Sequence, residues 1–236
     1  MTNSTYATTF TKQRLREVYW KSCSHEGYVN ILIYRPLALI CAVGFAKLRR
    51  TPNQVSMISF LIGIVGIILF AFGDYRLALL GLIPFHLGKM LDCADGQLAK
   101  LTGQTSALGA FLDPFLDRVT DAATMCALAV GYRLATGSDL ALYLVLGLLS
   151  VWFIGTYLDK FADTGASNLD NLRQTTSGLP PSVRRLLKWD GGFTGLVTTL
   201  AIVFGQIPAL IILTLAVATL PVPLSLLGLV RRLRKQ

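Results

Sequence analysis

Charged side chains are scarce in this sequence, and acidic side chains are the scarcer kind. Of the 236 residues, 15% are charged, with 13 acidic against 22 basic. A soluble domain averages about 25% charged residues. The hydrophobic fraction is 53% and the mean hydropathy is +0.56. These values exclude an ordinary soluble globular domain and indicate an integral membrane protein.

Cysteine is also rare, with four residues at positions 23, 41, 93 and 126. Three of them lie in apolar stretches, where a thiol behaves as a small hydrophobic side chain. Their spacing predicts neither a disulfide framework nor a zinc site. The N-terminal residues are polar and lack the apolar core of a secretory signal, so no cleaved signal is expected.

The excess of basic residues gives a net charge of +9 and a pI of about 9.6. These residues lie at the ends of apolar runs and not on a separate polar domain. The pattern favours an anionic membrane surface as the partner, and no nucleic acid partner is expected.

The apolar runs predict an all-α membrane protein with six transmembrane helices. The expected helices run from about Gln54 to Phe72, Leu77 to Lys100, Thr105 or Ser106 to Leu134, Leu140 to Tyr157, Phe193 to Phe204 and Pro208 to Val230. Residues 51–236 are therefore expected to form one six-helix transmembrane domain. The preceding residues 1–50 are expected to form a cytosolic and interfacial segment.

An apolar stretch within this N-terminal segment, Tyr28 to Ala46, is interrupted by Arg35 and Pro36. It is interpreted as an interfacial amphipathic helix along the cytosolic face, with a short re-entrant segment as the alternative. Thr51 then precedes the first transmembrane helix and is expected to N-cap it.

Lysine and arginine are distributed unevenly over the predicted loops. Six spans place both termini on one side, together with the long loop between the fourth and fifth spans, and this side holds most basic residues. The opposite side has Arg76 and Arg133. The positive-inside rule makes the first side cytosolic. We therefore expect a multi-pass protein of the cell membrane with its acidic cluster near the cytosolic surface.

Five of the acidic residues gather at the junction of the second and third predicted helices. Carboxylates in hydrocarbon cost at least ~2.5–3.5 kcal/mol each, so they must face one another, a cavity or a metal ion. Asp92 and Asp95 are three residues apart, and Asp113, Asp117 and Asp121 recur every four, so each set lines one helix face. A short loop makes the two helices antiparallel neighbours, and Asp121, the deepest, is expected to pair with a basic neighbour. Oxygen donors without His or Cys suit Mg²⁺ or Mn²⁺.

Small residues accompany the acids at Gly96, Ala99 and Gly109. Such residues permit close helix packing in membranes. Alternatively they leave room for a ligand beside the metal ion, and both interpretations stay open.

These residues together form a recognisable pattern, Asp92-x2-Asp95-Gly96-x2-Ala99-Lys100-x8-Gly109-x3-Asp113-x3-Asp117. It resembles the signature of the CDP-alcohol phosphotransferase family, D-x2-D-G-x2-A-R-x8-G-x3-D-x3-D. Seven of the eight named positions match, and the exception is a lysine where the family has arginine. The six predicted spans agree with the family's fold.

The resemblance implies a role for each acidic position. Asp92, Asp95 and Asp113 would hold the Mg²⁺ or Mn²⁺ ions that bind the diphosphate of a CDP-linked donor. Asp117 would be a further metal ligand and the general base.

The resemblance also implies where the donor's nucleotide would lie. Gly96, Ala99 and Gly109 would leave room for the cytidine, and Asn53 would approach it from the first span. Lys100 keeps the positive charge of the usual arginine but lacks its bidentate fork, which puts bidentate phosphate binding in doubt.

The implied reaction transfers a phosphatidyl (substituted phosphate) group from a CDP-linked donor to the hydroxyl of a small alcohol and releases CMP. The expected donor is CDP-diacylglycerol. The form of the motif resembles bacterial and archaeal members that handle inositol phosphate, so the expected acceptor is a phosphorylated polyol such as inositol phosphate or glycerol phosphate. The alternative within the family is a CDP-linked head group as donor, with a lipid or polyol phosphate as acceptor. The resemblance also implies a homodimer.

Basic residues of the long cytosolic loop are candidates for binding a phosphate on the acceptor. They are Arg173, Arg184, Arg185 and Lys188. An ordinary role as positive-inside anchors explains them equally well.

Two interpretations lie outside this family. Membrane prenyltransferases also bind a diphosphate through Mg²⁺ and carboxylates, but they separate their acidic motifs by a longer stretch and have more spans. A divalent-cation transporter would place its acids near the midplane of the membrane, whereas these acids lie toward one surface.

Overall fold

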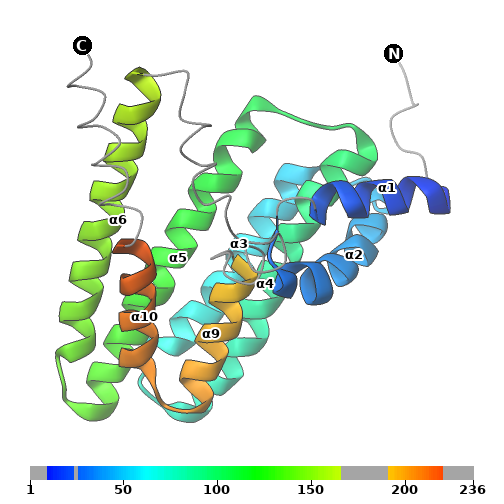
Figure 1. The fold of residues 1–236 in the computed structure, drawn as a ribbon. Coiled ribbons are helices and arrows are strands. Elements are labelled where there is room, and N and C mark those ends of the chain that lie inside the picture. Colours follow the sequence, from blue (N-terminus) through cyan, green and yellow to red (C-terminus); the bar gives the residue numbers. More distant parts are fainter. Residues whose placement is uncertain (1–9, 24–25, 166–190, 220–236) are drawn as a thin grey trace.

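The computed structural model describes residues 10–23, 26–165 and 191–219, and each regular element within these ranges is helical (Figure 1). The elements are α1 (Lys12–Cys23), the π-helix η1 (Asn30–Tyr34), α2 (Arg35–Lys47), α3 (Pro52–Phe70), α4 (Tyr75–Thr102), α5 (Ala107–Thr136), α6 (Leu140–Gly165), α9 (Gly191–Val203) and α10 (Ile207–Thr219). The predicted all-α class is confirmed.

The long helices α3, α4, α5 and α6 form the body of the molecule, and α1 lies crosswise at one end of it (Figure 1). The α2 helix packs against α4, while α9 contacts α4 and α10 contacts α6. One apolar core contains residues of α3, α4, α5, α6, α9 and α10. A second core contains residues of α1, α2, α3 and α4. The N-terminal segment is therefore packed onto the bundle through its own core.

The start of α3 is set by local sequence. The Thr51 hydroxyl accepts a hydrogen bond from the Gln54 amide at 3.4 Å, and the Gln54 side chain accepts one from the Thr51 amide at 3.1 Å. This capping box satisfies two backbone donors that the first turn of a helix leaves free, and Pro52 occupies the first turn without losing a bond. The predicted N-cap is confirmed.

The α3 and α4 helices pack closely through facing glycines. A Cβ atom built on Gly88 would lie 2.8 Å from Cα of Gly63, which is closer than side chains tolerate. Small residues let helix backbones approach in this way in membrane proteins. The contact brings the C-terminal half of α4, which carries Asp92 and Asp95, beside α3.

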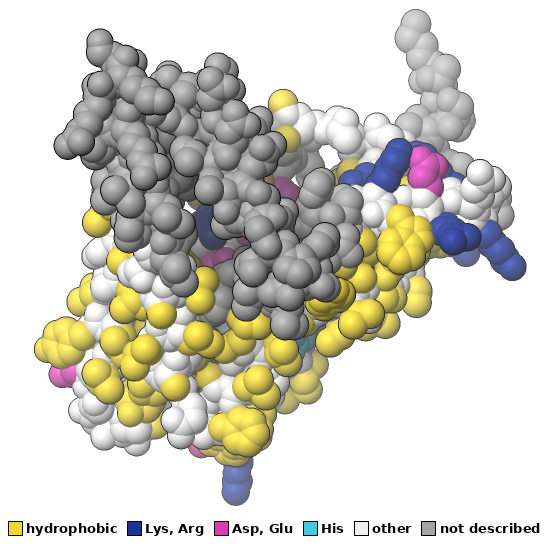
Figure 2. Space-filling model, viewed as in Figure 1, with side chains coloured by type: hydrophobic (Ala, Val, Ile, Leu, Met, Phe, Trp, Pro, Cys, Tyr) yellow, Lys and Arg dark blue, Asp and Glu magenta, His cyan; other side chains and the backbone are white. Residues whose placement is uncertain are grey.

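Three helical stretches are long and apolar enough to cross a membrane, namely Asn30–Lys47, Pro52–Phe70 and Tyr75–Thr102. Shorter apolar stretches are Leu140–Ile154, Gly191–Val203 and Ile207–Val217. Apolar side chains also cover much of the lower part of the face shown in Figure 2, whereas Lys and Arg gather at the end that carries α1. The described residues thus contain several helices suited to a membrane, and the count of six remains a prediction.

Two of the six predicted transmembrane helices, α5 and α9, lack in their described residues an apolar stretch long enough to cross a membrane. The α5 helix is long enough to span but carries Asp113, Asp117, Arg118 and Asp121 in its first half, so it is not among the three apolar stretches. Helix α9 has 13 residues and would extend about 20 Å, against about 30 Å for the hydrocarbon core. The predicted sixth span is described only to Thr219.

The stretch predicted as one helix, Tyr28 to Ala46, is helical throughout, because η1 runs directly into α2, with Arg35 and Pro36 in the first turn of α2. One predicted boundary was wrong. Helix α6 continues to Gly165, past the predicted end at Tyr157, through residues that include no proline. The interfacial placement of residues 28–46 and the division at residue 50 remain predictions.

Candidate active site

The connection between α4 and α5 folds the two acidic faces together. Gly103 ends α4 in a left-handed conformation with φ 70°, which favours glycine. Ser106 then N-caps α5 by accepting a hydrogen bond from the Gly109 amide at 2.9 Å. The acidic side chains of the two helices therefore meet, as the sequence predicted, although α5 packs mainly against α3 and α6 and not against α4 as an adjacent helix.

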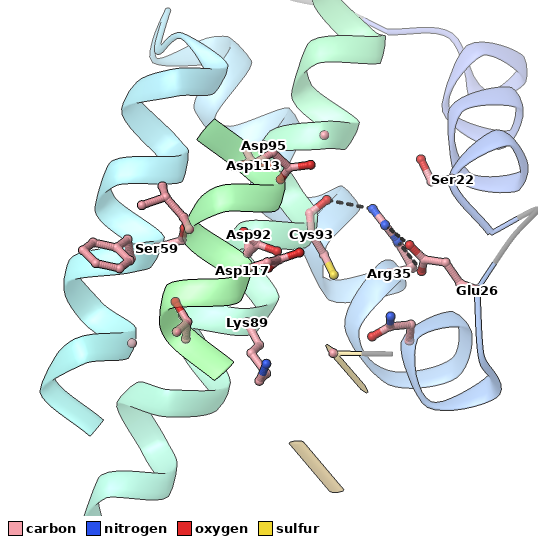
Figure 3. A pocket seen from close by; sticks show the side chains of 18 of the residues that line it. Ser22, Glu26, Arg35, Ser59, Lys89, Asp92, Cys93, Asp95, Asp113 and Asp117 are labelled. Carbon is pink, nitrogen blue, oxygen red and sulfur yellow. Dashed lines mark hydrogen bonds and ion pairs between the residues drawn. The ribbon is translucent and has the colours of Figure 1, made fainter. Parts of the chain in front are cut away.

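Three carboxylates converge at this junction. Asp92, Asp95 and Asp113 each offer an oxygen atom, and these atoms all lie within 4.8 Å of one another (Figure 3). Asp95 is buried, Asp92 is partly buried and Asp113 is exposed. Three carboxylates so close repel one another, and a divalent cation that prefers oxygen ligands relieves that repulsion. The donor set therefore fits Mg²⁺ or Mn²⁺.

The other two acids of α5 have different surroundings. Asp117 lines the same cavity as the three converging carboxylates but does not belong to that group (Figure 3). Asp121 lies 3.7 Å from Nζ of Lys89 and 3.9 Å from Nη1 of Arg118. The predicted pairing of Asp121 with a basic neighbour is confirmed.

A cavity of about 430 Å³ opens beside the carboxylates. Its walls include Asp92, Asp95, Asp113 and Asp117, with Gly96 and Lys100 on α4. A Cβ atom built on Gly96 would meet no heavy atom within 4 Å, so this glycine faces open space and not a packed helix. Of the two interpretations of the small residues, Gly96 fits room for a ligand.

The remaining predicted nucleotide residues lie elsewhere. Asn53, Ala99 and Gly109 are not among the described residues that line the cavity. A Cβ atom built on Gly109 would lie 2.9 Å from Oδ1 of Asn53, so Gly109 lets α5 approach the start of α3. For Gly109, the close-packing interpretation fits the structure.

The predicted phosphate-binding arginines of the long loop, Arg173, Arg184 and Arg185, lie outside the described residues, as does Lys188. Lys100, the lysine that replaces the family's arginine, is described. Its Nζ atom donates a hydrogen bond to the Ser22 hydroxyl at 3.0 Å, and both residues line the cavity.

Several residues that contact the acids or line the cavity were not predicted from the sequence. Ser56 on α3, which does not line the cavity, donates a hydrogen bond to Oδ2 of Asp95. Arg35 at the start of α2 forms an ion pair with Glu26 and donates a hydrogen bond to the Cys93 carbonyl at 3.0 Å (Figure 3). The arginine within an otherwise apolar stretch was the one available signal, since a charge there needs a partner.

Comparison with known proteins agrees with this geometry. Residues 49–161 match the model of the CDP-alcohol phosphatidyltransferase family, and this range contains all eight motif positions. An archaetidylinositol phosphate synthase of Pyrococcus horikoshii is 41% identical over 86 residues, which is 36% of this chain and 44% of that protein. A bifunctional IPC transferase and DIPP synthase of Aquifex aeolicus is 38% identical over 82 residues, or 35% of this chain and 18% of that protein.

A third relative matches this chain over a longer stretch. A bifunctional IPC transferase and DIPP synthase of Rubrobacter xylanophilus is 33% identical over 112 residues, which is 48% of this chain and 25% of that protein. The matched regions thus span less than half the length of each of these relatives. The resemblance to the CDP-alcohol phosphatidyltransferase family is thus confirmed over residues 49–161, which carry the converging carboxylates.

Proposed function

We propose that this protein is a metal-dependent transferase that moves a phosphatidyl group from a CDP-linked donor to the hydroxyl of a small alcohol and releases CMP. The observation that carries the proposal is the convergence of Asp92, Asp95 and Asp113 beside a cavity of about 430 Å³. Gly96 faces open space in that cavity, where a nucleotide would fit. The match of residues 49–161 to the family model supports the same reaction class.

Each acidic residue has a distinct task in this proposal. Asp92, Asp95 and Asp113 would hold Mg²⁺ or Mn²⁺, with Asp117 as a further ligand. A metal held by these residues would supply positive charge to neutralise the donor's diphosphate and the departing CMP. Gly96 and Lys100, which line the cavity, are proposed to accommodate the nucleotide end of the donor. The nucleotide roles of Asn53, Ala99 and Gly109, which do not line it, stay predictions from the resemblance.

Asp117 is proposed to act as the general base. It lines the cavity on the α5 side, where an acceptor hydroxyl would face the donor. The carboxylate takes the hydroxyl proton, and the oxygen attacks the donor phosphorus distal to the cytidine. The bond from that phosphorus to the bridging oxygen breaks, and CMP leaves with the bridging oxygen. Positioning and charge neutralisation supply most of the catalysis in such transfers.

The donor is proposed to be CDP-diacylglycerol and the acceptor a phosphorylated polyol, such as inositol phosphate or glycerol phosphate. One relative is named archaetidylinositol phosphate synthase. Because that name contains inositol phosphate, it supports this acceptor class. Arg173, Arg184 and Arg185 are proposed to bind the acceptor's phosphate. The protein is proposed to lie in the cell membrane with its active site on the cytosolic side and to form a homodimer.

The test is CMP release by the purified protein in detergent, with CDP-diacylglycerol and Mg²⁺ or Mn²⁺, against inositol phosphate, glycerol phosphate, serine, inositol and ethanolamine. We expect metal-dependent release with one phosphorylated polyol, and none from Asp113→Asn. Asp139→Asn, which changes a half-exposed acid paired with Arg133, should behave as wild type.

Other outcomes would redirect the assignment. Donor binding without release would reject this donor and acceptor pair and favour a CDP-linked head group with a lipid or polyol-phosphate acceptor. Pyrophosphate release would indicate a prenyltransferase, and metal flux in proteoliposomes without nucleotide dependence would indicate a transporter.

A further inference from the structure

The ion pair between Arg35 and Glu26 lies against the helix turn that carries the metal-binding acids. The two side chains are 12% and 17% exposed, so both charges are largely removed from solvent. Nε of Arg35 donates to Oε2 of Glu26 at 2.8 Å, and Nη2 donates to Oε1. Glu26 thereby holds the guanidinium by two parallel bonds, which fixes its orientation as well as its position.

The third bond of the guanidinium reaches α4. Nη1 of Arg35 donates to the Cys93 carbonyl at 3.0 Å, and Cys93 lies between Asp92 and Asp95 (Figure 3). The backbone of Arg35 makes a second link, because its carbonyl accepts a hydrogen bond from Nε2 of Gln97 at 3.3 Å. One residue of α2 therefore holds α4 at two points, on either side of Asp95.

A contribution to stability does not account for a buried pair of this kind. The cost of removing two charges from water generally offsets their attraction, and apolar replacements are often neutral or stabilising. A role in binding the donor's phosphates also fits poorly, because Glu26 neutralises the guanidinium and three of its five N–H groups already have partners. What the pair does supply is a fixed geometry at the turn that carries Asp92 and Asp95.

We propose that Arg35, oriented by Glu26, is a positioning residue that holds the Asp92–Asp95 turn of α4 in the geometry that binds the divalent metal. The inference rests on the proposed function, since it assumes a metal at these carboxylates. Groups that orient metal ligands from outside typically contribute 10–100-fold to metal affinity or activity. The N-terminal segment is then part of the metal site, although it lies outside residues 49–161 that match the family.

The test measures the dissociation constant of Mn²⁺ for the purified protein in detergent by calorimetry, without substrate, together with thermal unfolding. We expect Arg35→Gln to weaken Mn²⁺ binding by about tenfold. Glu26→Gln should weaken it less, because glutamine still offers one acceptor oxygen. The double variant should bind no more weakly than Arg35→Gln, since Glu26 acts through Arg35 and the two losses do not add.

Arg14→Gln is the matched control. Like Arg35, Arg14 pairs with a glutamate, Glu17, and donates a hydrogen bond to a carbonyl of α4, that of Lys100, at 2.9 Å. Unlike Arg35, it lies on the exposed surface, and its contact with α4 is beyond the turn that carries Asp92 and Asp95. Its Mn²⁺ affinity should equal that of the wild type. A merely structural role for Arg35 would lower thermal stability without changing the Mn²⁺ affinity of the folded protein.

The outcomes separate this inference from the proposed function. If the wild type binds Mn²⁺ and Arg35→Gln binds it equally well, the positioning role is wrong while the proposed function stands. If the wild type binds no Mn²⁺, both are wrong. Should Arg35→Gln fail to fold, Glu26→Gln decides, and an unchanged dissociation constant in that variant overturns the inference.

Discussion

The Ser56 hydroxyl on α3 donates a hydrogen bond to Oδ2 of Asp95 on α4, across 39 residues of sequence. Asp95 is the buried member of the three converging carboxylates, and this bond leaves its other oxygen for a cation. The close approach of Gly63 and Gly88 sets the two helices at the distance that the bond requires. Ser56 thus orients an acid of the candidate metal site from a neighbouring helix.

Replacing Ser56 with alanine should weaken metal binding by about tenfold, because Asp95 loses the group that orients it. The measurement is a Mn²⁺ titration of the purified protein by calorimetry. Ser150→Ala is the control, since the Ser150 hydroxyl bonds the Leu146 carbonyl of its own helix. Equal Mn²⁺ affinities for the wild type, Ser56→Ala and Ser150→Ala would show that Ser56 does not orient Asp95 for metal binding.

Asp95→Asn should weaken metal binding and donor binding together, because the donor's diphosphate is expected to bind through the metal. We expect a loss of at least about tenfold in each, measured by titrating Mg²⁺ against CMP release and by binding of CDP-diacylglycerol. An unchanged Mg²⁺ titration would exclude Asp95 as a ligand. Asp139→Asn again serves as the control acid.

Asp117→Asn should fold and keep most of its donor binding while turnover falls by about 10²–10⁴, the usual contribution of a general base. The amide has nearly the same shape as the carboxylate but does not accept the acceptor's proton. Turnover and donor binding are measured on the same preparation. Near-normal turnover would show that another group acts as the base.

Two glycines of α4 should respond differently to alanine. Gly96→Ala places a methyl group in open space, so the protein should fold normally, and binding of CDP-diacylglycerol should weaken because the cavity narrows. Gly88→Ala forces the new Cβ atom against Gly63, and overpacking of this kind costs about 1–3 kcal/mol. Thermal unfolding in detergent and donor binding distinguish the two effects. A destabilised Gly96→Ala protein with normal donor affinity would contradict the ligand space proposed at Gly96.

Local features of the fold were predictable from sequence. The capping box at Thr51 depends on residues three apart, and the shared faces of Asp92 with Asp95 and of Asp113 with Asp117 follow from helical periodicity. These interactions act over one turn, so a short stretch of sequence contains all the information they need. The meeting of the acids of α4 and α5 followed from the short connection between these helices, although the packing of α5 against α3 and α6 was not predicted.

Helix ends were less predictable than helix positions. Helix α6 runs on to Gly165, past the expected end at Tyr157, and the π-helical turn before Arg35 and Pro36 was not predicted. Glu26 makes the charge of Arg35 tolerable there by pairing with it. That pairing depends on the position of Glu26 in the folded protein, which the periodicity of the sequence does not predict.

The sequence by itself determined the helical class, the membrane character and the acidic signature, because composition, periodicity and spacing are properties of short segments. Tertiary structure alone decided which residues support the acids. Ser56 reaches Asp95 and Arg35 reaches Cys93 across 39 and 58 residues, and Gly96 faces a cavity while Gly109 packs against Asn53. Such contacts depend on the packing of whole helices, since side chains distant in sequence meet only after the backbone has been placed.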